Sequence, residues 1–275
     1  MAPSNTAHQT AQRAAQSDVL EKLLRMGFVG YGLLHLAVAW LALQLALGKP
    51  GQESDQGGAF RALADQPFGK ALLIAITVGL VAMALWQLLL AAIGHRAEQG
   101  FARTAERVGS GARTVIYAAL AWTAGRVAFG TSKSTAQESE SATAGIMERP
   151  AGQWLVGLIG LVVIAVGVGM VIYGLRRKFE KRLMINQMSA QTRKWARWLG
   201  QAGYAAKGVA LGIVGLLLIN AAVTSDPAKS RGLDSALRTL LEQPFGVAAL
   251  IAVALGFAAF GLYCFLQAKY RKVTE

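Results

Sequence analysis

Acidic residues are scarce in this chain, and they avoid its apolar segments. Aspartate and glutamate together number 15, against 28 lysines and arginines, which gives a formal net charge of +13. The six long apolar runs contain no carboxylate. Proton relays inside membranes normally use several such groups, so the sequence argues against a relay.

Cysteine and the common catalytic motifs are also missing. The single cysteine, Cys264, lies in an apolar run, which excludes an intrachain disulfide. The chain has no GxxxxGK[ST], HExxH, CxxC or GxSxG motif. We therefore expect no metal, no cofactor and no catalytic residue. The only candidates for a lipid-modifying enzyme are four acidic residues beside the outer loops: Asp65, Glu148, Asp226 and Glu242.

Apolar residues dominate what remains. They make up 54% of the sequence, charged residues only 16%, and the mean hydropathy is +0.40, which is typical of a membrane protein. About 20 apolar residues are needed for a helix to cross a bilayer. Six segments are long enough, and they lack the alternation of a barrel strand. We predict an all-α membrane protein with six transmembrane helices, at roughly 28–47, 68–93, 111–130, 153–175, 203–223 and 245–266.

The distribution of charge predicts the orientation. The N-terminal tail, the second and fourth loops with the starts of the spans that follow them, and the C-terminal tail hold 19 of the 28 basic residues. The other three loops hold nine of the 15 acidic ones. Basic loops face the cytoplasm, so we expect a multi-pass protein of the inner (plasma) membrane with both termini cytoplasmic. Attraction to anionic lipid explains the positive charge, and we expect no nucleic-acid partner.

The sequence repeats itself three times. Three glycines (Gly27, Gly109 and Gly203) are each followed 40 or 41 residues later by a proline: Pro67, Pro150 and Pro244. Each repeat contains a span, an outer loop, a proline corner and a second span. An even number of spans keeps all copies in one orientation, so we predict three tandem hairpins with pseudo-threefold symmetry about the membrane normal. The predicted units are a polar tail 1–26, repeats 27–94, 107–178 and 199–268, a basic segment 179–198 and a basic tail 269–275.

The prolines mark structural corners. A proline in the first turn of a helix sacrifices no hydrogen bond, so we predict that each one starts the second span of its repeat. The segments before two of them, AFRALADQ and ALRTLLEQ, are typical of short amphipathic helices in the interface. Their basic residues are predicted to form i, i+4 pairs, Arg61 with Asp65 and Arg238 with Glu242.

The corners DQPFG and EQPFG, the glycine-led segment GQAGYAAKGVA and the ending GLYCFLQAKYRK together resemble a bacterial integral-membrane family, domain-of-unknown-function family 1206. The resemblance covers about residues 20–272. It implies an inner-membrane helical protein and no particular chemistry. The middle corner departs from the pattern, because it reads ERPAG.

Equivalent positions in the three repeats suggest two candidate sites. Gln44, Arg126 and Asn220 fall at one depth, where they would form a polar ring if they faced the axis. Arg126 could hold an anion there. Alternatively, the three lie at the interface, and Arg126 extends to water or pairs with an acidic residue at an outer corner.

The second set lies near the cytoplasmic ends and contains Tyr31, Arg113 and Lys207, with His35 one turn beyond Tyr31. Topology alone explains basic residues at this depth. The functional alternative is a mouth that binds a lipid headgroup or an anion. Because no carboxylate accompanies His35, a buried imidazole with one hydrogen bond is expected rather than a proton relay.

The basic segment 179–198 is predicted to be an amphipathic helix on the cytoplasmic surface, anchored by Trp195 and Trp198. Three functions remain open. The first is a non-enzymatic scaffold or accessory protein with a protein partner or a second copy. The second is a small-solute or anion pathway along the threefold axis. The third, with least support, is a lipid-modifying enzyme.

Overall fold

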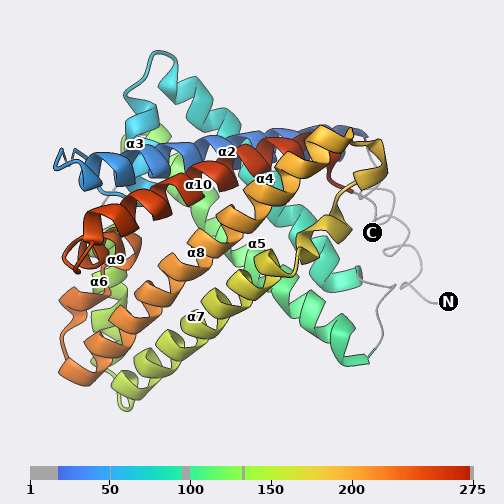
Figure 1. The fold of residues 1–275 in the computed structure, drawn as a ribbon. Coiled ribbons are helices and arrows are strands. Elements are labelled where there is room, and N and C mark those ends of the chain that lie inside the picture. Colours follow the sequence, from blue (N-terminus) through green and yellow to red (C-terminus); the bar gives the residue numbers. More distant parts are fainter. Residues whose placement is uncertain (1–17, 50, 95–99, 132–133, 273–275) are drawn as a thin grey trace.

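The computed structural model describes residues 18–49, 51–94, 100–131 and 134–272. This described part is helical throughout, with nine α-helices, three short 3-10 helices and a single isolated β-bridge. Long helices run between the two ends of the molecule (Figure 1). α2 begins and α10 ends at one of these ends, which we name the terminal end; the opposite end is the outer end.

Six helices are long. Their bounds are α2 Asp18–Ala46, α4 Gly69–Ile93, α5 Gly100–Ala128, α7 Gly152–Leu175, α8 Ala190–Thr224 and α10 Gly246–Tyr270. Five of them are long and apolar enough to cross a membrane, and α5 is the exception. Its sequence carries four arginines and Glu106 within 29 residues. The protein is therefore an all-helical membrane protein with five clear candidate spans.

The long helices pair across the boundaries between repeats. α4, the second helix of the first repeat, packs along α5, the first helix of the next. In the same way α7 packs along α8, and α10 returns to pack along α2. The last helix of the chain thereby contacts the first, as the adjacent blue and red ribbons in Figure 1 show.

The middle repeat is open. α2 packs against α4 within the first repeat, and α8 against α10 within the third, but α5 and α7 do not pack along each other in the described part of the chain. α7 has only one long neighbour, α8. Its remaining apolar side chains, including Trp154 and Leu158, are not covered by protein.

Glycine permits the close contact between α7 and α8. A Cβ atom at Gly208 would lie 2.5 Å from the carbonyl oxygen of Gly167, and one at Gly215 would lie 2.7 Å from that of Gly160. The two backbones approach more closely than any side chain allows, as is common between helices in membranes.

Each corner is a tight turn followed by a glycine. The amide of Gly69 donates to the carbonyl of Gln66 at 2.8 Å, and Phe68 between them has φ 62°. Proline at the second position and a left-handed residue at the third define a type II turn. Gly246 with Phe245 and Gly152 with Ala151 repeat this geometry.

The glycine after each turn is required by space. A Cβ atom at Gly69 would lie 2.3 Å from the carbonyl oxygen of Ala64, at the end of the preceding short helix. Phe68 and Phe245 adopt the left-handed conformation at a cost of about 1–2 kcal/mol each, and both rings point outward, 88% and 89% exposed.

The prediction that proline occupies the first turn of the second span is wrong. α4, α7 and α10 begin at glycine, two residues after Pro67, Pro150 and Pro244. The prolines fix the turn that precedes the helix. The corners themselves lie where the repeat placed them.

Short helices precede all three corners: α3 Gln56–Ala64, α6 Thr135–Met147 and α9 Gly232–Leu241, with a 3-10 helix, η3, at Pro227–Ser230. The two amphipathic helices predicted before Pro67 and Pro244 are thus confirmed. Their ion pairs differ from expectation, because Arg238 pairs with Asp234 at 2.7 Å instead of Glu242, and Arg61 pairs with Glu53 at 2.6 Å.

The basic segment 179–198 is not a separate surface helix. Two 3-10 helices, η1 Lys178–Arg182 and η2 Ile185–Gln187, follow α7, and Trp195 and Trp198 belong to the first turns of α8. The 3-10 segment pairs with the end of the chain, since the amide of Met184 donates to the carbonyl of Tyr270 at 2.8 Å. At the N-terminus, α2 already begins within the predicted tail 1–26, most of which lies outside the described residues.

Gly208→Ala should destabilise the fold, because the added methyl group meets the backbone of α7. We expect a loss of about 1–3 kcal/mol in the free energy of unfolding, as for other overpacked sites. Gly212→Ala is the matched control, since a Cβ atom there meets nothing within 4 Å. It should be neutral or stabilising by up to about 1 kcal/mol. Thermal unfolding of both variants in detergent tests the contact, and equal melting temperatures would contradict it.

Candidate functional site

The predicted outer ring is not assembled by direct contacts. Arg126 forms an ion pair with Glu138 of α6 at 2.6 Å, which is none of the acidic partners considered from the sequence. Asn220 is exposed on α8, and Gln44 is half-buried on α2. No hydrogen bond joins any two of Gln44, Arg126 and Asn220 within the described ranges.

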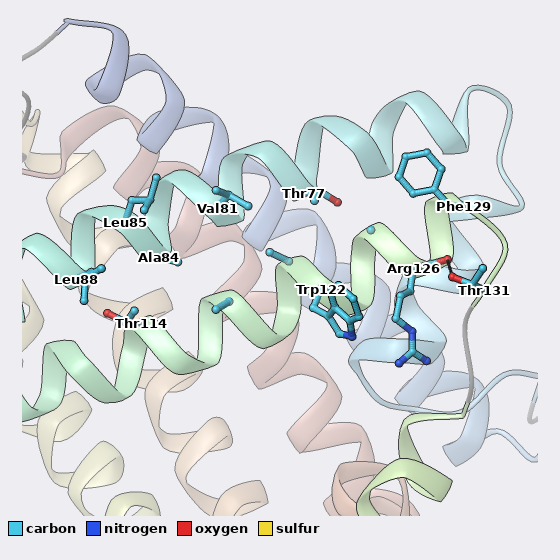
Figure 2. A pocket seen from close by; sticks show the side chains of 13 residues that line it. Thr77, Val81, Ala84, Leu85, Leu88, Thr114, Trp122, Arg126, Phe129 and Thr131 are labelled. Carbon is cyan, nitrogen blue, oxygen red and sulfur yellow. Dashed lines mark hydrogen bonds between the residues drawn. The ribbon is translucent and has the colours of Figure 1, made fainter.

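Arg126 instead lies at the outer end of a groove between α4 and α5. The groove has a volume of about 680 Å³ and an apolar lining. Figure 2 shows Arg126 beside Phe129 and Thr131, with its guanidinium turned away from α4. Trp122, one helical turn before Arg126 on α5, is largely exposed along the same groove. A groove of this kind suits a lipid chain.

The three short helices are joined to one another at the outer end of the bundle. The amide of Ser54, just before α3, donates to Asp234 of α9 at 2.7 Å. Ser134, the N-cap of α6, donates its hydroxyl to Glu53. Arg231, before α9, donates to Glu140 of α6 at 2.8 Å. We name this arrangement the outer cap.

Asp55 is the most deeply buried carboxylate of the outer cap. It is 1% exposed and caps α3 by accepting the amide hydrogen of Gly58 at 2.8 Å. Burial raises the pKa of Asp55 to about 6, and the neighbouring Glu53 and Asp234 add to the rise, whereas the Gly58 amide and Arg61 oppose it. The carboxyl group is therefore easier to protonate in the folded protein.

The four acidic residues considered for catalysis have separate local partners or positions. Asp65 accepts a hydrogen bond from Gln52 at 2.9 Å, and Asp226 caps η3 by accepting from Ala228 at 3.1 Å. Glu148 and Glu242 end α6 and α9. Searching the described residues finds no group of three or more metal-ligating side chains.

The second predicted set does converge, near the terminal end of the bundle. The ammonium group of Lys207 donates to the hydroxyl of Tyr31 at 2.9 Å and lies 4.0 Å from the ring centre of Phe260. The ring of Tyr31 meets that of Tyr117 edge-on at 5.5 Å. Helices α2, α5, α8 and α10 all contribute to this contact.

His35 and Arg113 border the same region. Nδ1 of His35 lies 2.8 Å from the carbonyl oxygen of Tyr31, and its ring lies 4.7 Å from Phe260, so it is the singly bonded, buried imidazole that was expected. Arg113 reaches across to α4 and donates to the Gln87 side chain at 3.3 Å.

Two further basic residues of this region were not predicted. Arg182 comes from the 3-10 segment, and Arg271 from the end of α10. The β-bridge between Leu183 and Arg271 brings them together, and Arg271 stacks on the rings of Trp86 and Phe28 at 5.0 and 5.1 Å. We name these basic residues and the tyrosines around them the basic–aromatic cluster. Its members are Arg113, Arg182, Lys207 and Arg271, with Tyr31, Tyr117, Tyr173, Tyr204 and Tyr263.

Sequence reasoning assigned Arg271 to a basic tail and Arg182 to a surface helix. The missed signal was aromatic: Tyr173, Tyr204 and Tyr263 each lie within a long apolar helix, near its terminal end. Tyrosine hydroxyls buried at that depth need polar partners, which indicates that basic residues fold back over them.

The pKa of Asp55 generates a test of the outer cap. Because this pKa is higher when folded than the ordinary 3.8, the folded state binds the proton more tightly, and stability falls as the pH rises from about 4 to 6. Asp55→Asn keeps an N-cap acceptor and removes the charge. It should stabilise the protein at pH 7.5 by about 1–3 kcal/mol and leave it unchanged at pH 4.

Thermal unfolding in detergent at the two pH values measures this difference. Asp234→Asn is the control, since it breaks the ion pair with Arg238 and should destabilise the protein at pH 7.5. An Asp55→Asn variant less stable than the wild type at both pH values would show that the carboxylate is needed in its charged form.

Comparison with known proteins agrees with the three-repeat architecture. The chain matches the family described as Domain of Unknown Function (DUF1206) over three successive segments, residues 26–94, 108–177 and 202–271. It is 31% identical over 259 residues to the Uncharacterized protein YxxB of Bacillus subtilis (strain 168), which covers 93% of this chain and 92% of the relative. No solved structure matches. The chain belongs to the DUF1206 family.

Proposed function

We propose that the protein is a six-span protein of the bacterial inner (plasma) membrane, with both termini in the cytoplasm, that acts as a non-enzymatic scaffold or accessory protein. The excess of basic residues in the segments at the terminal end supports this orientation. Anionic lipid at the cytoplasmic face is a further expected partner.

The case for α5 as the sixth span rests on its packing and its arginines. α5 lies along α4, and its 29 residues span about 43 Å at 1.5 Å per residue. Arg113 is hydrogen-bonded to Gln87, and Arg126 is paired with Glu138. Both arginines are therefore neutralised or hydrogen-bonded within the protein, which lowers the cost of placing them in a membrane.

Pseudo-threefold symmetry about the membrane normal is part of the proposal. It is supported by the repeated type II turns and by the order of pairing, in which each second helix meets the first helix of the next repeat. The open middle repeat is a local departure from that symmetry.

The observation that carries the scaffold function is the uncovered surface of α7. Many of its apolar residues are not covered by its one long neighbour in the described part of the chain, α8, and Trp154 is 84% exposed. α5 does not close this side. An apolar membrane-spanning segment of a protein partner, or of a second copy, would fill the space between α5 and α7 by close packing.

The alternative functions have less support. An anion pathway along the axis would need an outer exit, where the outer cap joins the three short helices, and a free Arg126, which is paired. An enzyme would need convergent acidic groups, and the four candidates are bound to separate local partners or helix ends.

A photo-crosslinking residue at Leu161 of α7 should give a discrete protein adduct in cell membranes, because that side chain lies on the uncovered surface. The same residue at Leu85, which lines the groove between α4 and α5, should react with lipid only. The adduct is read as a mass shift on a gel and by mass spectrometry. Equal labelling at the two positions, or no protein adduct, would remove the support for a scaffold.

Vesicles reconstituted with the wild-type protein should show no more anion flux than empty vesicles. Flux that Arg126→Ala abolishes would establish the pathway instead, because that substitution removes the one arginine of the predicted outer ring. Flux is measured with an anion-sensitive dye trapped inside the vesicles.

A further inference from the structure

The four basic side chains of the basic–aromatic cluster share one neighbourhood. Arg113 and Arg182 both reach the carboxylate of Glu106, and the β-bridge at Leu183 brings Arg271 beside Arg182. Tyr117 contacts the ring of Tyr31, whose hydroxyl accepts a hydrogen bond from Lys207. These residues come from α5, the 3-10 segment, α8 and the end of α10, so distant parts of the chain bring positive charge to one place.

The acidic residues near the cluster are too few to neutralise its four basic side chains. Glu106 of α5 contacts Arg182 at 2.8 Å and Arg113 at 3.8 Å. The nearby Glu180 is already paired with Arg197 at 3.0 Å. Within the described residues, no ion pair is formed by Lys207 or Arg271. Partly buried cations without counter-charges destabilise a protein unless an anion joins them.

Buried hydrogen-bond donors in the same place are also without partners. Nε of Arg271, which is 8% exposed, and the hydroxyls of Tyr173 and Tyr263 make no hydrogen bond. The ring of Tyr204 links them, lying 4.9 Å from Tyr173 and 5.9 Å from Tyr263. Arg182 lies 5.8 Å from the ring centre of Tyr173. Such donors normally find a partner, and an acceptor that binds here would supply it.

The chemistry of these groups fits a phosphate. Arginine forks and a lysine ammonium are the side chains that bind phosphate oxygens most strongly, and tyrosine hydroxyls add neutral donors. A tetrahedral oxyanion offers several acceptors at once. It would therefore satisfy orphaned donors and offset unpaired positive charge at the same time.

We propose that the basic–aromatic cluster binds a phosphate group, either of a phospholipid headgroup or of a soluble phosphate. Arg113, Arg182 and Arg271 carry the charge recognition, Lys207 supports it from the side of Tyr31, and Tyr173 and Tyr263 donate hydroxyl hydrogens. The site lies at the terminal end of the long helices, where headgroups and cytoplasm meet in the proposed orientation. It is independent of the uncovered surface of α7 and of the scaffold role.

Binding is tested on the full chain, delipidated in a maltoside detergent that contains no phosphate. One series adds sodium phosphate against sodium chloride at equal ionic strength. The other adds phosphatidic acid to the micelles against diacylglycerol with the same acyl chains. Saturable thermal stabilisation is expected in at least one series. The series that responds identifies the source of the phosphate.

Two substitutions connect the response to the cluster. Arg271→Gln should weaken binding by roughly tenfold or more, in line with the loss of a charged hydrogen bond. Lys272→Gln, next along the chain, has the same change in charge and should alter affinity by less than about twofold.

Tyr263→Phe keeps the test decisive if Arg271→Gln does not fold. The hydroxyl it removes has no hydrogen bond in the free protein, so a purely structural tyrosine predicts unchanged affinity and unchanged or higher stability. Our proposal predicts an affinity lower by roughly three- to tenfold at undiminished ligand-free stability. The proposal is overturned by no saturable response in either series, by equal effects of Arg271→Gln and Lys272→Gln, or by wild-type affinity in Tyr263→Phe.

Discussion

The contact between the second long helix of one repeat and the first long helix of the next is the interaction on which the bundle depends. A hairpin of two apolar helices has too little surface of its own to bury, and helices in a membrane associate through close packing instead of through water exclusion. Glycine provides that closeness between α7 and α8, and again where Gly32 of α2 meets Gly261 of α10. Pairing α10 with α2 joins the last repeat to the first.

Polar groups occupy the two ends of this framework. At the outer end, the hydrogen bonds of Ser54, Ser134 and Arg231 join the short helices into a cap. At the terminal end, the 3-10 segment and the end of α10 bring Arg182 and Arg271 over buried tyrosines. Arginines of the first end are paired with carboxylates, whereas the second end leaves buried donors and positive charge without partners among the described residues. That difference places the proposed phosphate site at the terminal end.

Much of the framework could be predicted from the sequence, because periodic features dictate it. Three features recur along the sequence: the apolar runs, the spacing of Pro67, Pro150 and Pro244, and the motifs of the three-repeat family. Each of them corresponds to a repeated helix or corner in the structure. The finer contacts could not be predicted. Arg238 has an acidic residue four positions away on either side, and the sequence does not choose between Asp234 and Glu242. The turn at Phe68 was missed because a left-handed phenylalanine contradicts residue preferences.

The candidate sites likewise combine positions that the repeat predicts with contacts that it does not. Tyr31 and Lys207 occupy equivalent positions in two repeats, and the fold brings them into direct contact. Arg126 belongs to an equally regular set, but a local acidic residue, Glu138, pairs with it. Arg271 lies beyond the predicted third repeat, 199–268, so only the return of the chain end onto the 3-10 segment reveals its place. Repetition predicts depth in the membrane, while the partner of a side chain depends on non-repeating loops.

The most direct test of the cyclic pairing is a disulfide between the first and last long helices. With Cys264 replaced by alanine, cysteines at Leu36 of α2 and Gly261 of α10 should cross-link in native membranes, because these positions are in contact. A second pair, at Val115 of α5 and Val162 of α7, should remain reduced. Linked peptides identified by mass spectrometry from the first pair alone agree with our account. Linkage of the second pair without the first would contradict it.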